Sequence, residues 1–392
     1  MRRAVLMIGA IALFVPSAAQ ASSIDHLAYT AGPGEENHVT VSYDNDTGLF
    51  RFEDTGVAAI GSSGTSGCSV TGNVAYCPMD WGGQVVVRLG DRNDSAVLTT
   101  QLPHVLTASN LYSGHIQMIG GAGNDSLDAS PERPFDGSFY TSGGASLWGD
   151  GYRNDRVDPI GADDGNDVLI GGAGEDGFLG GGGDDVEIGG GGPDFFDGSP
   201  FITGSGGIDV YSGGSDSMYG GAGSDVFNGV ESSAPNASDT ISCGDGEEGP
   251  LSSGFLPNQD LKVPGDTVAF GQGDVVGTDC ETVAAGIECP KTADAPCVGT
   301  TQLSGNASAG GNASASAAGR AAEKRGRKLV IGSRGFRVPP GHLIAVRVGL
   351  RPKRVSSLLS RRERARVNQT AIARSGKKRL KLRGKRFVLR RP

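Results

Sequence analysis

Residues 162–197 read ADDGNDVLI, GGAGEDGFL, GGGGDDVEI and GGGGPDFFD, four consecutive blocks with a strict period of nine. Each block has an aspartate at its sixth position. Similar blocks begin at Gly120 (GGAGNDSLD), Gly204 (GSGGIDVYS) and Gly220 (GGAGSDVFN). Glycine adopts positive φ without steric cost, so the first six residues can form a tight open loop and the last three a short strand. The pattern predicts an all-β array of alternating loops and strands.

An apolar residue recurs at the eighth position of most blocks, where it would point into the interior of the array. The expected inward side chains are Leu169, Phe178, Phe196, Tyr211, Met218 and Phe227. Glu187 interrupts this series, and we expect the neighbouring Ile188 to take its place. The 66 glycines would also suit a disordered linker. Four copies in phase, with the apolar position in register, favour the folded array.

These blocks resemble the hemolysin-type calcium-binding, or RTX, nonapeptide GGxGxDxUx, in which U is apolar. The resemblance implies a right-handed parallel β-roll in which two blocks make one turn and loops on the same side stack with Ca²⁺ between them. Loop carbonyls and aspartate carboxylates are the hard oxygen ligands that Ca²⁺ prefers. The expected calcium ligands are Asp125, Asp155, Asp164, Asn166, Asp167, Gly172, Gly174, Asp176, Gly181, Gly183, Asp185, Gly190, Gly192, Asp194, Asp209, Asp216 and Asp225.

The half-turns can be assigned to two sides, A and B, by counting alternately from residue 143. Three irregular half-turns, at 143, 198 and 213, then fall together on side B. Side A would carry a continuous calcium ladder formed by Asp155, Asp176, Asp194, Asp209 and Asp225. Side B would hold a single good site between Asp167 and Asp185. Without calcium, the stacked carboxylates would repel one another, so folding is expected to require the metal.

The N-terminus has the features of a secretory signal peptide. Arg2 and Arg3 precede an apolar run over 4–15, and Ala19-Gln20-Ala21 is a small-residue cleavage site. The mature chain would begin at Ser22. The apolar run is too short to span a bilayer, so we expect a secreted protein that does not span a membrane.

Six cysteines suit an oxidising compartment. The simplest pairing is local, with bonds Cys68–Cys77, Cys243–Cys280 and Cys289–Cys297, although other pairings stay open. A zinc site is the rival interpretation, but the chain has no C-x-x-C pair and no histidine near its cysteines.

The charges separate along the chain. Residues 320–392 hold 25 Lys and Arg against 2 acidic residues, whereas 1–319 hold 10 basic and 42 acidic residues. We expect the tail to meet an anionic cell-surface polymer or the protein's own acidic body. A basic surface that is merely solvated is the alternative. Nucleic acid is not expected as a partner, because Phe336 and Phe387 are the only aromatic residues of the tail.

Catalytic signatures are missing from the sequence. None of the five histidines lies in H-E-x-x-H, and there is no G-x-S-x-G. His38 or His104 could meet a serine in space, but an ordinary surface or core histidine is the simpler interpretation. We therefore expect a non-enzymatic, calcium-binding structural or adhesion protein. The alternative is a secreted hydrolase, acting on protein, lipid or glycan, that carries the roll as an accessory.

The expected organisation has six parts around an all-β roll. The N-terminal cap is expected to contain a hairpin over 38–58 and a degenerate rung over 85–94. At the C-terminal end, alternating apolar residues predict a small β-sandwich-like module with a short helix near 355–359. The parts are a signal peptide (1–21), a β-rich cap with degenerate rungs (22–119), the RTX roll (120–245), a disulfide-pinned closing cap (246–298), a flexible linker (299–327) and a basic β-rich module (328–392).

Overall fold

A computed structural model of the chain shows an all-β protein, with one short helix in the part that it describes. The described residues are 21–62, 64, 67–79, 84–103, 105–107, 110–112, 115–131, 144–150, 152–153, 156–157, 165–197, 215–222, 225–228, 239–244, 267–269, 274–280, 282–307, 328–341, 343–360, 362–382 and 384–391. The expected signal peptide therefore lies outside them, except for Ala21.

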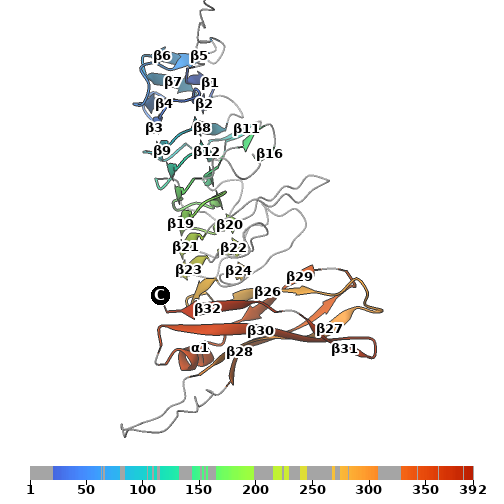
Figure 1. Cartoon of the computed structure of the whole chain (residues 1–392). Helices are drawn as coiled ribbons and strands as arrows, with labels where there is room; N and C mark the ends of the chain where they lie inside the picture. The colour runs from blue at the N-terminus through green and yellow to red at the C-terminus, as the bar shows by residue number, and fades with distance from the viewer. Residues whose placement is uncertain are drawn as a thin grey trace, which may run out of the picture.

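Two parallel sheets form a β-roll, and the chain passes alternately from one to the other (Figure 1). Sheet 1 contains β8 (Val85–Asp91), β12 (Ile116–Ala122), β14 (Ala145–Trp148), β18 (Gly177–Leu179), β20 (Phe195–Asp197), β22 (Val226–Asn228) and β24 (Thr267–Ala269). Sheet 2 contains β9 (Ser95–Leu98), β13 (Ser126–Asp128), β17 (Val168–Ile170), β19 (Val186–Gly191), β21 (Ser217–Ala222), β23 (Thr240–Gly244) and β25 (Val275–Gly277). Leu169 pairs with Glu187, 18 residues later, so two nonapeptides make one turn.

The interior consists of two facing rows of side chains, one from each sheet. Sheet 1 contributes Tyr29, Val87, Met118, Leu147, Phe178, Phe196, Phe227 and Val283. Each pairs in register with the next, and the backbone of Val268 in β24 lies between Phe227 and Val283. The rings of Phe178, Phe196 and Phe227 stack with centroids 4.7 and 4.6 Å apart. Sheet 2 contributes Val39, Ala96, Leu127, Leu169, Glu187, Met218, Ile241, Val276 and Leu389.

Glu187 lies in the interior row, and the prediction that Ile188 would replace it is wrong. The Glu187 side chain is 1% exposed, whereas Ile188 is only partly buried. Glu187 pairs with Leu169 on one side and with Met218 on the other. A shift of β19 by one residue would turn all of its side chains to the opposite face of the sheet. The register therefore keeps the Glu187 carboxyl in the interior.

The N-terminal cap continues both sheets and closes one end of the roll. Its strands are β1 (Ser23–Asp25), β2 (Ala28–Thr30), β3 (His38–Asp44), β4 (Leu49–Asp54), β5 (Gly61–Ser62), β6 (Ser69–Thr71) and β7 (Val74–Pro78). β2 pairs with β8 in sheet 1, and β3 pairs with β9 in sheet 2. The rungs thus begin well before residue 120, the start that the sequence suggested for the roll. Two short hairpins, β10 (Val105–Thr107) with β11 (Asn110–Tyr112) and β15 (Tyr152–Arg153) with β16 (Arg156–Val157), pair apart from the two sheets.

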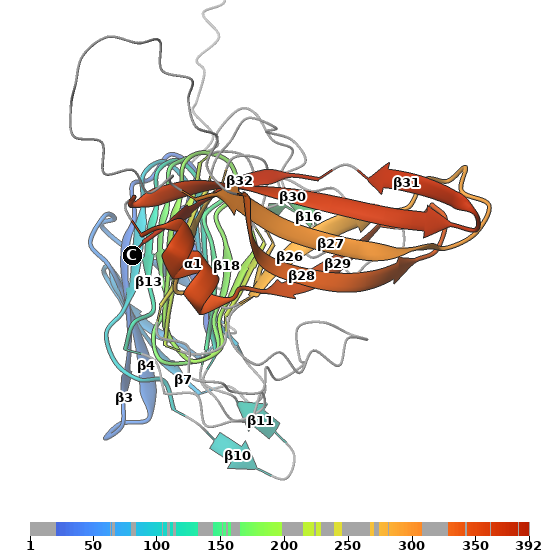
Figure 2. The same ribbon diagram turned by 90° about the horizontal axis from the view of Figure 1, so that it is seen from below.

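The C-terminal strands also continue the roll rather than forming a separate module. They are β26 (Thr282–Glu288), β27 (Cys297–Asn306), β28 (Lys328–Val338), β29 (Leu343–Gly349), β30 (Arg364–Ser375), β31 (Lys378–Leu382) and β32 (Arg386–Arg390), with the helix α1 (Pro352–Leu358). β32 pairs in parallel with β25, and β29 pairs antiparallel with β26. Seen from below, β27, β28, β30 and β31 project to one side of the roll (Figure 2).

Two predicted boundaries at this end are wrong. β27 covers Cys297–Asn306 and lies between β28 and β30, so the linker cannot begin at 299. β24, β25 and β26 add further rungs within the range that was expected to form an irregular closing cap. The three local disulfides are confirmed as Cys68–Cys77, Cys243–Cys280 and Cys289–Cys297.

Candidate metal centre

The loops of the roll fall into two sets, one at each edge. At edge 1 the chain passes from sheet 1 to sheet 2, and at edge 2 it returns. At both edges an aspartate immediately precedes the next strand. The edge 1 aspartates are Asp94, Asp125, Asp167, Asp185, Asp216, Asp239 and Asp274, and those of edge 2 are Asp176, Asp194 and Asp225. All ten are buried, so carboxyl groups line both edges beneath the surface.

The edge 1 aspartates form a hydrogen-bonded ladder. From Asp94 to Asp216, the backbone N–H of each aspartate donates to Oδ1 of the aspartate in the next turn. The N···O distances are 2.8 Å for Asp94–Asp125, 2.7 Å for Asp125–Asp167, 2.8 Å for Asp167–Asp185, 3.0 Å for Asp185–Asp216 and 3.1 Å for Asp216–Asp239. Each of these carboxyls accepts a ladder bond through Oδ1 only. The same bond orients the carboxyl and so fixes where Oδ2 points.

The second oxygen, Oδ2, is the atom that indicates a cation. In Asp94, Asp125, Asp167 and Asp185 it is buried and has no hydrogen-bond partner in the described part of the chain. A buried carboxylate oxygen is costly unless it is compensated by a hydrogen bond or a cation. The residues therefore fit a cation at this edge.

The glycines explain where such a cation would lie. A Cβ atom built on Gly149 would collide with Oδ2 of Asp167 and with the carbonyl oxygen of Gly180. The same relationship links Gly120 with Asp125 and the carbonyl of Gly149. The space beside each of these glycines is thus bordered by a carboxylate and a carbonyl oxygen, the donor set that Ca²⁺ prefers. No group of three or more His, Cys, Asp or Glu side chains converges within the described residues, so backbone carbonyls must complete each site.

Burial raises the pKa of these carboxyls in the metal-free roll. Removal from water is the largest cause, and the charges of neighbouring aspartates add to it. The pKa values are about 7 for Asp94, 8 for Asp125, 7 for Asp167, 10 for Asp185 and 6 for Asp216. A bound divalent cation would shift the pKa of these carboxyls in the opposite direction, because it favours the ionised carboxylate.

Edge 2 carries a shorter ladder of the same kind. Ala145 N–H donates to Oδ1 of Asp176 at 2.7 Å, Asp176 N–H to Asp194 at 3.1 Å, and Asp194 N–H to Asp225 at 3.0 Å. A Cβ atom on Gly189 would meet Oδ2 of Asp194 and the carbonyl of Gly220. Edge 2 therefore repeats the donor set of edge 1 over fewer turns.

The predicted assignment of sides is wrong for the half-turn counted from 143, whereas the described blocks at 162, 180 and 213 share one side and those at 171, 189 and 220 the other, as predicted. Asp176, Asp194 and Asp225 do share one edge, as expected, but the longer ladder follows Asp167 and Asp185 on the other. The half-turn counted from 143 belongs to sheet 1, because β14 pairs with β18. β19 pairs directly with β21, and β20 with β22, so the blocks at 198 and 204 do not intervene. Asp155, Asp164, Asp209 and Tyr211 lie outside the described residues.

A second, exposed ladder runs beside the aspartates of edge 1. Its side chains occupy the fifth loop position and donate in the opposite direction along the roll. The bonds run from Asn124 N–H to Asn93 Oδ1 (2.9 Å), Asn166 N–H to Asn124 (2.9 Å), Asp184 N–H to Asn166 (2.9 Å) and Ser215 N–H to Asp184 (2.7 Å). Asn166, expected as a calcium ligand, is therefore a member of this outer ladder.

The loop glycines that were expected as ligands have a conformational role. Gly181, Gly183, Gly190 and Gly192 have φ of 103° or 104°, a region that side chains disfavour. Gly172 accepts a hydrogen bond from Gly191 N–H at 2.7 Å, and the carbonyl of Gly174 lies against Gly192. Arg92 lies two residues before its loop aspartate, as Gly183 and Gly192 do, and its φ is 100°. A strained non-glycine residue therefore completes this early rung.

Three aspartates of edge 1 were not among the expected ligands: Asp94, Asp239 and Asp274. Each precedes a short β-branched or apolar strand, but their loops lack most of the glycines of the repeat. The strand register, rather than the motif, identifies them. Asp150 was also missed, and its Oδ2 accepts from Gly182 N–H at 2.5 Å.

The two ends of the edge 1 ladder are closed by different groups. At the N-terminal end, Asn37 N–H donates to Oδ1 of Asp94 at 2.7 Å, so a neutral amide replaces the next aspartate. At the C-terminal end, burial lowers the pKa of Lys385, and the charge of Asp274 opposes this shift only in part.

Comparison with protein families agrees with this geometry. The model of the RTX calcium-binding nonapeptide repeat matches residues 117–131, 154–187 and 203–230, with four copies. No curated protein and no solved structure matches the chain. Among the described residues, no helix is long and apolar enough to cross a membrane.

Proposed function

We propose that this chain, which carries RTX calcium-binding repeats, is a secreted structural or adhesion protein. Calcium holds the roll together in this proposal, and the basic C-terminal strands tether it to an anionic polymer at the cell surface. Extracellular sites commonly bind calcium at about 10⁻⁴–10⁻³ M, so the roll would fold after export.

The observation that carries the tether is the outer face of β30. Along this strand buried and exposed residues alternate, and the exposed positions include Arg364, Arg366 and Arg374. Arg386 and Arg390 on β32 pair with exposed positions of β30, and Arg379 and Lys381 on β31 do the same. Every second residue of a strand faces the same side. These side chains therefore share one cationic face, which suits a polyanion.

The pairing of β32 with β25 joins this face to the calcium roll. Val388 N–H donates to the carbonyl of Asp274, the last aspartate of edge 1, at 2.7 Å. A tether of this kind transmits force into the roll without a flexible joint. The roll would then act as a rigid, calcium-dependent spacer.

A secreted hydrolase is the second candidate, and one contact favours it. His38 Nδ1 lies 2.9 Å from Ser95 Oγ, and His38 Nε2 lies 3.9 Å from Glu36 Oε1. This order of serine, histidine and carboxylate is that of a nucleophilic triad. Both partners of the His38–Glu36 pair are exposed, at 49% and 64%, and a solvated pair at 3.9 Å orients the ring weakly.

Release from cells distinguishes the two candidates. The tether predicts that high salt or a calcium chelator frees intact protein from the cell surface, while Ser95→Ala leaves attachment unchanged. Hydrolysis of a protein, lipid or glycan substrate that is lost in Ser95→Ala, with calcium binding retained, would support the hydrolase instead. Protein that salt and chelator fail to release would count against the tether.

A further inference from the structure

A pocket opens on the cationic face of the C-terminal strands. Its cavity measures about 500 Å³. The lining residues come from five strands and the turn before β32: Ser304, Asn306, Lys328, Asn368, Gln369, Thr370, Lys381, Leu382, Gly384, Lys385 and Arg386. None of these described lining residues is acidic, so the site selects against cations.

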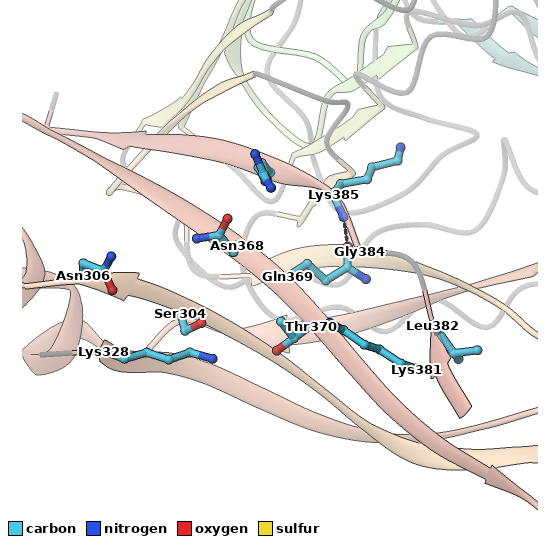
Figure 3. A pocket seen from close by; sticks show the side chains of 11 residues that line it. Ser304, Asn306, Lys328, Asn368, Gln369, Thr370, Lys381, Leu382, Gly384 and Lys385 are labelled. Carbon is cyan, nitrogen blue, oxygen red and sulfur yellow. Dashed lines mark hydrogen bonds between the residues drawn. The ribbon is translucent and has the colours of Figure 1, made fainter. Parts of the chain in front are cut away.

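Neutral polar groups lie between cationic ones in this pocket. Figure 3 shows Ser304, Asn368 and Thr370 between Lys328 on one side and Lys381 on the other. Ser304 pairs with Asn368, and Asn368 with Arg386, so these three form a row across neighbouring strands. Strand spacing of about 4.8 Å gives that row a length of about 10 Å, comparable to one or two sugar rings.

The floor of the pocket is held in place by a buried amide. Gln369 is 4% exposed, and its Oε1 accepts a hydrogen bond from Lys385 N–H at 3.2 Å. This bond fixes the turn that leads into β32, and with it the position of Arg386. A preformed site of this kind loses little conformational freedom when a ligand binds.

The chemistry of the lining narrows the class of ligand. Residues 299–392 contain no Trp or Tyr, and Phe336 and Phe387 are only 8% and 1% exposed. No ring is therefore available to stack on a nucleobase or on the flat face of a neutral sugar. Hydroxyl and amide groups flanked by cations suit a sugar that carries a carboxylate or sulfate.

We propose that this pocket binds an acidic sugar residue of a glycan polyanion. The inference rests on the proposed tether and assigns its specificity to the pocket, while the surrounding arginines supply general attraction. Asn368 and Thr370 bind sugar hydroxyls, and Lys328, Lys381 and Arg386 bind the acidic groups.

The test uses the mature chain with calcium at fixed salt. Hyaluronan oligosaccharides present carboxylates, heparin oligosaccharides add sulfates, dextran is the neutral control, and single-stranded DNA matches the charge. We expect hyaluronan or heparin, or both, to bind more tightly than DNA. The paired change Asn368→Leu and Thr370→Val is expected to weaken glycan binding about tenfold and to leave DNA binding unchanged, since about 1.4 kcal/mol corresponds to tenfold.

The matched control replaces charges outside the pocket. Arg364→Ser with Arg366→Ser should weaken every polyanion alike and flatten the salt dependence. Glycan binding that survives the Asn368 and Thr370 changes, or DNA that binds at least as tightly as the glycans, would overturn the pocket but leave the tether. Failure of the unaltered chain to bind any polyanion would overturn both. Calcium-dependent circular dichroism equal to that of the unaltered chain shows that each variant is folded.

A separate observation concerns Ser22, the residue after the expected cleavage site. Its side chain is 0% exposed. Ser22 N–H and Oγ–H both donate to Oε2 of Glu35, at 3.1 and 2.5 Å, and Gly32 N–H donates to the same oxygen at 2.9 Å. Tyr29 Oη–H and Asn37 Nδ2–H donate to Ser22 Oγ at 2.8 and 3.2 Å. The residue expected to begin the mature chain is thus built into a polar cluster.

We infer that cleavage after Ala21 is a maturation step that completes this cluster. Hydrolysis of the Ala21–Ser22 peptide bond leaves a carboxylate on Ala21 and an α-ammonium on Ser22, at an atom already in contact with Glu35. The resulting ion pair ties β1 to the loop that precedes Asn37. The other titratable groups of the cluster, Tyr29 and Asp54, hydrogen-bond to one another.

The test compares three forms of the calcium-loaded protein. We expect intact mass to show Ser22 as the first residue of the secreted chain. NMR should show the pKa of its α-amino group above the ordinary value of about 7.7–8.0. Glu35→Gln, or one glycine added before Ser22, should return that pKa to its ordinary range. A different N-terminus, or an ordinary pKa in the unaltered chain, would contradict the inference.

Discussion

The backbone N–H of Asp167 donates to Oδ1 of Asp185, one turn away, at 2.8 Å, while Oδ2 of Asp185 is buried without a hydrogen-bond partner in the described part of the chain. One oxygen therefore builds the roll and the other remains for a ligand. Because this arrangement repeats along edge 1, the same aspartates form the hydrogen bonds of the roll and offer an oxygen to a cation. Removing the metal should consequently affect stability and not only binding.

The pH dependence of the metal-free roll follows from the raised pKa values. An unfolded carboxyl titrates near pH 3.9, whereas Asp216, Asp94, Asp125 and Asp185 titrate at about 6, 7, 8 and 10. Between these values the folded state binds more protons than the unfolded state. Stability must therefore fall as pH rises above about 4 and continue to fall through pH 6–10.

Thermal unfolding in a chelator tests this sign. Without calcium we expect an unfolding transition at pH 5 that is lower or lost at pH 8, and with calcium the reverse order, because the ion binds the ionised form. Equal midpoints at the two pH values in chelator would show that the buried carboxyls do not control folding.

Asp185→Asn separates the two oxygens of the carboxyl. The amide oxygen still accepts from Asp167, but folding no longer requires this buried position to take up a proton. The metal-free roll should become more stable by about 1–3 kcal/mol, and calcium should stabilise this variant less than the unaltered chain. Denaturant unfolding with and without calcium measures both effects. Asp184→Asn is the control, since Asp184 is exposed in the outer ladder, and we expect it to change neither quantity by more than about 0.5 kcal/mol.

Two adjacent glycines give a matched test of the loop geometry. Gly192 has φ of 104°, and a Cβ there would collide with the carbonyl of Gly174. Gly191 meets nothing closer than 3.7 Å. Gly192→Ala should therefore cost at least about 2 kcal/mol and weaken calcium binding, whereas Gly191→Ala should stay within about 1 kcal/mol. Similar losses in both variants would argue against the described loop.

Glu187 allows a test of the core. Its carboxyl is 1% exposed in a row of apolar side chains, and burying a charge is costly. Glu187→Leu should raise the free energy of unfolding at pH 8, and Glu187→Gln should raise it less, because the amide is still polar. A loss of stability in Glu187→Leu would mean that the carboxyl has a structural role at this position.

The sequence was most informative where a local pattern repeats. The nine-residue period, the loop aspartates and the inward Phe178, Phe196 and Phe227 could all be predicted, because each depends on residues close in sequence. The side of the half-turn at 143 could not, because the segment between Trp148 and Gly165, which separates it from the regular blocks, does not follow the period. The register, set by pairs such as Leu147–Phe178, decides that question.

Long-range pairing explains the other errors. Val275 pairs with Val388, more than a hundred residues away, so nothing local shows that the basic strands continue the roll. Asp94 and Asp274 were missed for a similar reason, since their loops have lost the motif while their strands keep the register. The burial of Glu187 follows from its paired neighbours and not from its own side chain.

The central claim is that calcium folds the roll, and a titration followed by far-UV circular dichroism tests it most directly. Mature protein stripped of metal should gain β-signal cooperatively at about 10⁻⁴–10⁻³ M calcium, and magnesium at the same concentration should not replace it. An unchanged spectrum across the calcium titration would contradict the account, because the buried aspartates would then be accommodated without a metal ion.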